Sequence, residues 1–159
     1  MVEPSFKEYQ KALMSRISTD IPRFGHTVIG ILPREDEPPA PPFFYTVGRH
    51  SKNLPELLMV GPISGEQGMD IVNAVAAQQG TGFHHGQLVD LGSKCPVMII
   101  DATDPILKDK YTNCVNAYYR THNYRVQQIL LPDRHGVLPP GCDSPFDCQP
   151  ILGKLPELV

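Results

Sequence analysis

Residues 26–61 read HTVIGILPREDEPPAPPFFYTVGRHSKNLPELLMVG, and this stretch decides the fold class. It contains three short runs rich in β-branched and aromatic residues, at 26–32, 43–49 and 57–61, and such runs favour strands. A proline-rich segment, 33–42, separates the first two runs. Because prolines donate no main-chain hydrogen bond, this segment predicts an exposed hairpin connection, and a proline-motif ligand for a partner domain is the alternative.

Three helices are predicted around these strands. A capping-box pattern at Ser5–Glu8 begins the first, which ends at 22–25, and a second such pattern begins a helix over 64–80. Asp104-Pro105 suits the cap and first position of the third helix. The apolar stripes that predict the buried helix faces are Phe6, Tyr9, Leu13 and Ile17; Met69, Ile71, Val72, Val75 and Ala76; and Leu107, Tyr111, Cys114, Val115 and Tyr118.

The remaining strand-like runs are 87–91, 97–101 and 125–131. The predicted order is α-β-β-β-α-β-β-α-β, which indicates the α+β class, with a mixed, mostly antiparallel sheet and about three helices packed on it. The length of 159 residues fits a single domain. Its expected parts are an N-terminal helix and linker at 1–24, a core at 25–140 and a proline-rich tail at 141–159.

The composition argues against several classes of function. The chain has 14 Lys and Arg against 17 Asp and Glu, a net charge of −3, whereas nucleic-acid binders usually carry a basic excess. No run approaches 18 apolar residues, and the N-terminus lacks the features of a secretory signal. We therefore expect no nucleic-acid partner, no membrane segment and a cytoplasmic location, where the four cysteines would be free thiols.

The sequence predicts neither a bound metal nor a cofactor. Gly80–Gly86 follows a helix and precedes a strand, whereas phosphate-binding loops follow a strand and open a helix. His84 and His85 are adjacent, and adjacent side chains of a strand point to opposite faces. Cys142 and Cys148 lie too far apart in the sequence for the usual spacing of zinc ligands.

Polar residues at the ends of predicted strands form the candidate site. Such groups meet at a pocket mouth in many α/β proteins, and His, Glu and Asp side chains supply acid–base chemistry. The alternative is structural: Asp makes turns, and a strand Tyr fills the core with its hydroxyl bonded. The candidate pocket residues are His26, Tyr45, Thr46, His50, Glu56, Asp133 and His135.

Several of these residues belong to a pattern whose specific pieces are Tyr-Thr-x-Gly at 45–48 and Pro-Asp-x-x-Gly at 132–136. Over 25–140 the chain resembles the domain-of-unknown-function family 4262 of bacteria and their phages. The resemblance carries no established activity. The family often has an aromatic residue shortly after the Pro-Asp piece, and 138–141 has none. The matching segments are Gly25-His26, Pro42–Gly48, Pro55–Leu57, Asp104-Pro105 with Tyr111, and Gln128–Gly136.

Three functions stay open. The first is a non-catalytic binding or regulatory accessory protein of a bacterium or its phage, acting through a bacterial or host protein partner. It is favoured because no nucleophile elbow, Walker loop or zinc-protease motif is present, which also argues against an enzyme. The second is a small enzyme that uses His26, Tyr45, Glu56, Asp133 and His135. The third is a nucleotide or flavin binder. Unpaired sheet edges also favour a homodimer.

Overall fold

The fold is known from a computed structural model. Several predicted features lie outside the residues that it describes: Ser5, Gly80–Gly82, Cys95, His135, Cys142, Cys148 and most of the proline-rich segment. The described residues are 6–33, 36, 41–61, 63–78, 83–92, 96–133, 136–139 and 149–156.

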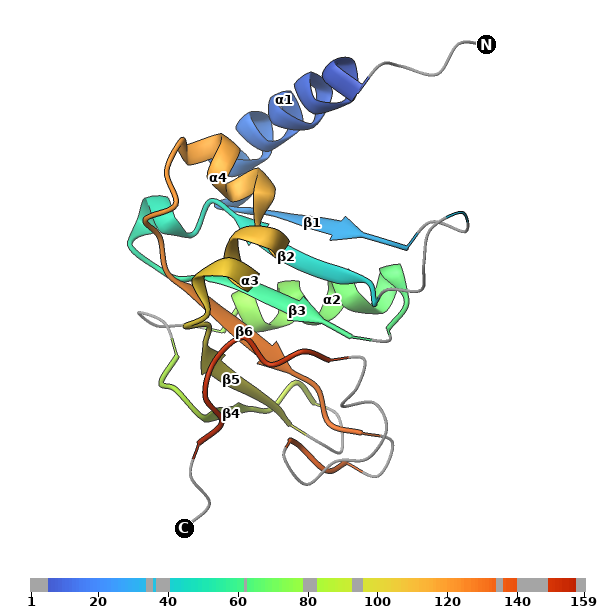
Figure 1. Ribbon diagram of the computed structural model, residues 1–159, viewed down its shortest axis with the longest axis vertical. Helices are drawn as coiled ribbons and strands as arrows, with labels where there is room; N and C mark the ends of the chain where they lie inside the picture. Colours follow the sequence, from blue (N-terminus) through green and yellow to red (C-terminus); the bar gives the residue numbers. More distant parts are fainter. Residues whose placement is uncertain are drawn as a thin grey trace.

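The predicted α+β class is confirmed, with one six-stranded mixed sheet (Figure 1). The strand order is β1-β2-β3-β6-β5-β4, and only the β3–β6 pair is parallel. Strand bounds differ from the predicted ones by two residues or fewer. The strands are β1 (Thr27–Ile31), β2 (Phe43–Val47), β3 (Glu56–Val60), β4 (Gln87–Val89), β5 (Val97–Asp101) and β6 (Val126–Leu130).

Helices cover both faces of the sheet (Figure 1). One face packs against α2, whose Val72 and Val75 join Phe44 and Met59 in one core cluster. The other face packs against α1, α3 and α4 in a second cluster. No helix in the described part of the chain is long and apolar enough to cross a membrane. The helices are α1 (Phe6–Phe24), α2 (Gly65–Ala76), α3 (Pro105–Tyr111), α4 (Asn113–Tyr119) and a short 3-10 helix, η1 (His50–Lys52).

The predicted third helix is two helices, so the expectation of one continuous element was wrong. Thr112 lies between α3 and α4 with φ −113° and ψ 44°, outside helical geometry. Its hydroxyl donates to the main-chain oxygen of Lys108 (2.6 Å) and contacts the hydroxyl of Tyr124. Side-chain bonding of this kind competes with the helix. The apolar period continues through the break because Tyr111 and Val115 still face one core.

The predicted buried stripe of α1 is correct at only some positions. Ile17 is fully buried, and Leu13 packs against the same cluster. Tyr9, however, is 57% exposed, because the N-terminal part of α1 extends past the sheet (Figure 1). Periodicity identifies the apolar stripe of a helix but cannot show how far the surface beneath it reaches.

Three buried glutamines pair with the main chain of neighbouring segments. Each amide donates to a main-chain oxygen and accepts from a main-chain N–H, as a strand residue does. These pairs attach the loop before β4 and the irregular C-terminal tail to β6. They join Gln127 to Phe83 (2.7 and 3.3 Å), Gln128 to Pro150 and Leu152 (2.6 and 2.8 Å), and Gln149 to Leu131 (3.1 and 2.6 Å).

Candidate functional site

The carboxylate of Glu56, fully buried at the start of β3, organises the loop that follows β2. Its oxygens accept from the Thr46 hydroxyl (2.8 Å) and from the main-chain N–H groups of Gly48, Arg49 and His50 (3.2, 3.1 and 2.9 Å). Burial raises the pKa of Glu56, and these hydrogen bonds act in the opposite direction. The loop is therefore held by the side chain that the next strand supplies.

Gly48 allows this loop to close. Its φ is +124°, a conformation that side chains rarely adopt. A Cβ there would lie 3.0 Å from the main chain of both Gly25 and His26. The glycine thus brings the 48–50 loop against the end of α1, next to the start of β1.

The loop turns Arg49 inward, and the residue is only 5% exposed. Its Nε donates to the main-chain oxygen of Pro55 (2.9 Å). Within the described part of the chain, the two terminal guanidinium nitrogens have no hydrogen bond and no carboxylate within ion-pair distance. Burial lowers the pKa of Arg49 and the nearby Glu56 carboxylate opposes this shift, but a guanidinium stays charged in proteins.

Arg49 lines a hollow of about 500 Å³ between the end of α1, the 48–54 loop and the end of α2. We call this space the Arg49 hollow. Lys52 and His26 bring further nitrogen groups to it, and Asn73 supplies an amide. The described residues that line it include no Asp or Glu. The other lining residues are Phe24, Leu54, Ala76, Ala77 and Gln78.

His26 separates the Arg49 hollow from a second hollow of about 480 Å³. Its Nε2 donates to the Asn73 side-chain oxygen (3.1 Å). Burial lowers the pKa of His26, the bond to Asn73 raises it, and the charges of Arg49 and Lys52 lower it further. The ring is therefore mainly neutral near neutral pH.

The second hollow differs in charge from the Arg49 hollow, because the arginine that lines it, Arg16, is already paired with an aspartate. Arg16 Nε lies 3.6 Å from the Asp20 carboxylate, which also accepts from the Thr27 hydroxyl (3.1 Å). Arg16 donates in addition to the main-chain oxygen of Val28 (3.2 Å). Unpaired positive charge is thus concentrated on the Arg49 side of His26.

The predicted pocket residues are divided between several places. Thr46 and Glu56 meet in the network beneath Arg49, and His50 joins them through its main chain while its ring packs on Tyr119 (4.9 Å between centroids). Tyr45 is buried on the other face of the sheet, where its hydroxyl accepts from the main chain of Cys114 (3.2 Å).

Asp133 lies after the end of β6, whereas Glu56 begins the parallel neighbour β3, so the two are at opposite ends of the sheet. The Asp133 carboxylate accepts from Val137 N–H (2.9 Å) and closes a turn. His135 lies outside the described residues. Of the predicted side chains that are described, His26 alone lines the Arg49 hollow.

Sequence reasoning did not identify Arg49, Lys52 or Asn73. The available signal was a charged residue directly after the strand piece at 45–48 and before the buried Glu56. A carboxylate expected inside the core needs donors, and the adjacent loop is the nearest source. Among the described residues, no group of three or more His, Cys, Asp or Glu side chains is placed to hold a metal ion.

Comparison with known families accounts for most of the chain. The family model for a domain of unknown function, DUF4262, matches residues 20–143. The chain belongs to the DUF4262 family. No curated protein and no solved structure matches it. In this DUF4262 domain, the matched region contains every residue named above for the Arg49 hollow and for the Glu56 network beneath it.

Proposed function

We propose that this DUF4262 protein is a binding protein whose ligand presents an oxoanion, a phosphate or carboxylate group, to Arg49. The observation that carries the proposal is Arg49, a residue only 5% exposed whose guanidinium is bonded through Nε alone among the described residues and lines the Arg49 hollow. A buried charge is costly unless it is paired. The planar fork of arginine suits an oxoanion because it offers parallel donors.

The rest of the hollow supports the same ligand class. Lys52 adds a second cation, and the lining brings no carboxylate that would repel an anion. A space of about 500 Å³ lies within the usual range for small-molecule sites. Among the described residues, the lining contains no Cys, Ser or Thr nucleophile, which favours binding over covalent catalysis.

The proposal keeps the predicted nucleotide ligand open, because a nucleotide phosphate is one oxoanion that would satisfy Arg49. The predicted protein partner, homodimer and cytoplasmic location stay predictions. The enzyme alternative has less support, since the described members of its acid–base set are spread over both faces and both ends of the sheet.

Isothermal titration with inorganic phosphate and with malonate tests the proposal and separates the two oxoanion types. We expect a dissociation constant on the order of 1 mM for the preferred anion, which corresponds to a binding free energy of about −4 kcal/mol. Lys52→Gln and Arg49→Lys should each weaken binding, and added salt should weaken it further. Lys154→Gln, an exposed lysine in the tail, is the matched control. Equal binding by Lys52→Gln, Arg49→Lys and the unmodified protein would refute the proposal.

A further inference from the structure

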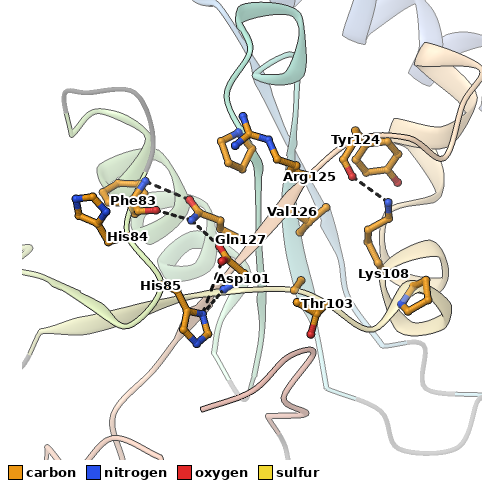
Figure 2. Close-up of a pocket in the computed structure, with 13 residues that line it drawn as sticks. Phe83, His84, His85, Asp101, Thr103, Lys108, Tyr124, Arg125, Val126 and Gln127 are labelled. Carbon is orange, nitrogen blue, oxygen red and sulfur yellow. Dashed lines mark hydrogen bonds and ion pairs between the residues drawn. The ribbon is translucent and has the colours of Figure 1, made fainter. Parts of the chain in front are cut away.

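A separate cleft, of about 590 Å³, lies where β5 ends and β6 begins (Figure 2). Strand β3 lies between β6 and the strands next to the Arg49 hollow. Val126 and Gln127 of β6 and Asp101 of β5 line it together with the loop that carries His85. Lys108 and Tyr124 stand on the opposite wall in the view of Figure 2. None of its lining residues lines the Arg49 hollow.

Two of the polar side chains in this cleft are used to build its walls. Gln127 binds both main-chain groups of Phe83 and donates to Asp101 Oδ1 (3.0 Å). Lys108 donates to the main-chain oxygens of His122 and Tyr124 (2.7 and 3.0 Å) and lies 4.1 Å from the centroid of the Tyr124 ring. These contacts hold both groups in the walls of the cleft, and Lys108 keeps its charge and a third N–H.

Asp101 and Arg125 bring two further, opposite charges to the cleft. Asp101 has one carboxylate oxygen bonded to Gln127, and its other oxygen lies 3.9 Å from His85 Nδ1. That ring nitrogen accepts from Asp101 N–H (2.9 Å), so a neutral His85 carries its proton on Nε2. Arg125 donates to the main-chain oxygen of Asn53 (3.0 Å). No ion pair joins Asp101 and Arg125, although both line the cleft.

The sheet register fixes the backbone positions of these two residues. Asp101 pairs with Gln127 across the strands, so Arg125 is its diagonal neighbour, with Cα atoms about 7–8 Å apart. The two side chains therefore start from neighbouring positions of the sheet and border the same cleft, and no ion pair closes the space between them. Pro55 and the partly buried Phe83 line the same space and give it an apolar part.

We propose that this cleft binds a small zwitterion, an amino acid with an apolar side chain, with its ammonium group on Asp101 and its carboxylate on Arg125. One such molecule satisfies both charges at once, while the apolar lining receives its side chain. This site is independent of the oxoanion site.

Isothermal titration at neutral pH with three matched probes tests the assignment. L-leucine carries both charges, 4-methylpentanoate lacks the ammonium group, and 3-methylbutylamine lacks the carboxylate. We expect leucine to bind at least about tenfold more tightly than either analogue, because each loses one charge-assisted contact. Equal binding of leucine and one analogue, or no binding of leucine or phenylalanine at ~10 mM, overturns the proposal.

Two variants assign the charges. Asp101→Asn keeps an oxygen that accepts from Gln127 but loses the charge that holds the ammonium group. This variant should therefore bind leucine no more tightly than it binds 4-methylpentanoate. Arg125→Gln should bind leucine no better than 3-methylbutylamine. Asp70→Asn, an exposed aspartate on α2, is the matched control and should bind as the unmodified protein does. Thermal unfolding of each variant confirms that it is folded, and leucine binding by Asp101→Asn at the original strength refutes the assignment. Lys52→Gln should leave leucine binding unchanged.

Discussion

Thr46→Val removes one buried hydroxyl while it retains the shape of the side chain and its branching at Cβ. In the native protein that hydroxyl donates to Glu56 Oε1 (2.8 Å) and accepts from Leu57 N–H (2.9 Å). All three residues are fully buried. The substitution therefore leaves one main-chain N–H without a partner and takes one donor from a buried carboxylate.

Hydrogen bonds to charged groups contribute about 1.5–3 kcal/mol, and an unsatisfied buried donor costs about 1–3 kcal/mol. Adding values near the lower end of each range gives a loss of about 3 kcal/mol in the free energy of unfolding. For a domain of this size, that loss lowers Tm by about 6–12 °C.

Thermal and urea unfolding measure the effect, with Thr46→Ser as the matched control. Serine keeps the hydroxyl and loses one methyl group, which costs about 1 kcal/mol. Thr103→Val, at an exposed position, controls for the general effect of the exchange. If Thr46→Val is as stable as Thr46→Ser, the hydroxyl does not hold the Glu56 network together and the reasoning is wrong.

Three further predictions concern packing, titration and the tail. Gly68→Ala should lose about 1–3 kcal/mol of stability because the added Cβ would lie 2.4 Å from the Phe44 ring. Gly65→Ala, whose Cβ would lie 3.6 Å from Leu32, is the control and should lose less, and chemical denaturation compares the two variants. The pKa of His26 is lower in the folded than in the unfolded chain, so the protein should lose stability relative to His26→Gln as pH falls from 6.5 through the folded pKa. Tm of both proteins, measured at several pH values, tests this, and equal pH dependence would contradict it. Gln149→Ala should speed hydrogen exchange at Leu131 N–H, which its side chain covers, and unchanged exchange would contradict the pairing.

The sequence predicts the elements of this fold well because their signals are local. As the capping patterns in the sequence predict, the Ser64 side chain accepts from Gln67 N–H, and the Asp104 side chain accepts from Ile106 and Leu107 N–H. The strands likewise follow their β-branched runs. The parallel pairing of β3 with β6 joins residues about 70 positions apart, and no local pattern encodes such a contact.

The site was harder to predict because its chemistry depends on burial. Thr46 was identified as a polar residue within an apolar strand and Glu56 as a polar residue just before the next strand, and they do meet. Arg49 was missed because arginine is mostly exposed, and its burial here needs the Glu56 network and the end of α2 together. The burial of Gln127 and Gln128 has no local signal either, since their main-chain partners come from distant segments.

The position of β6 has a consequence for synthesis on the ribosome. Of the strands in the described part of the chain it is the last to emerge, yet it occupies the middle of the sheet between β3 and β5. Until residue 130 has left the exit tunnel, the nascent chain holds two separate antiparallel pieces, each with one apolar edge that lacks its neighbour. Edges of this kind invite pairing with other chains. Translational pausing before β6 should therefore expose the growing chain to chaperones and to aggregation, whereas a pause after it should not.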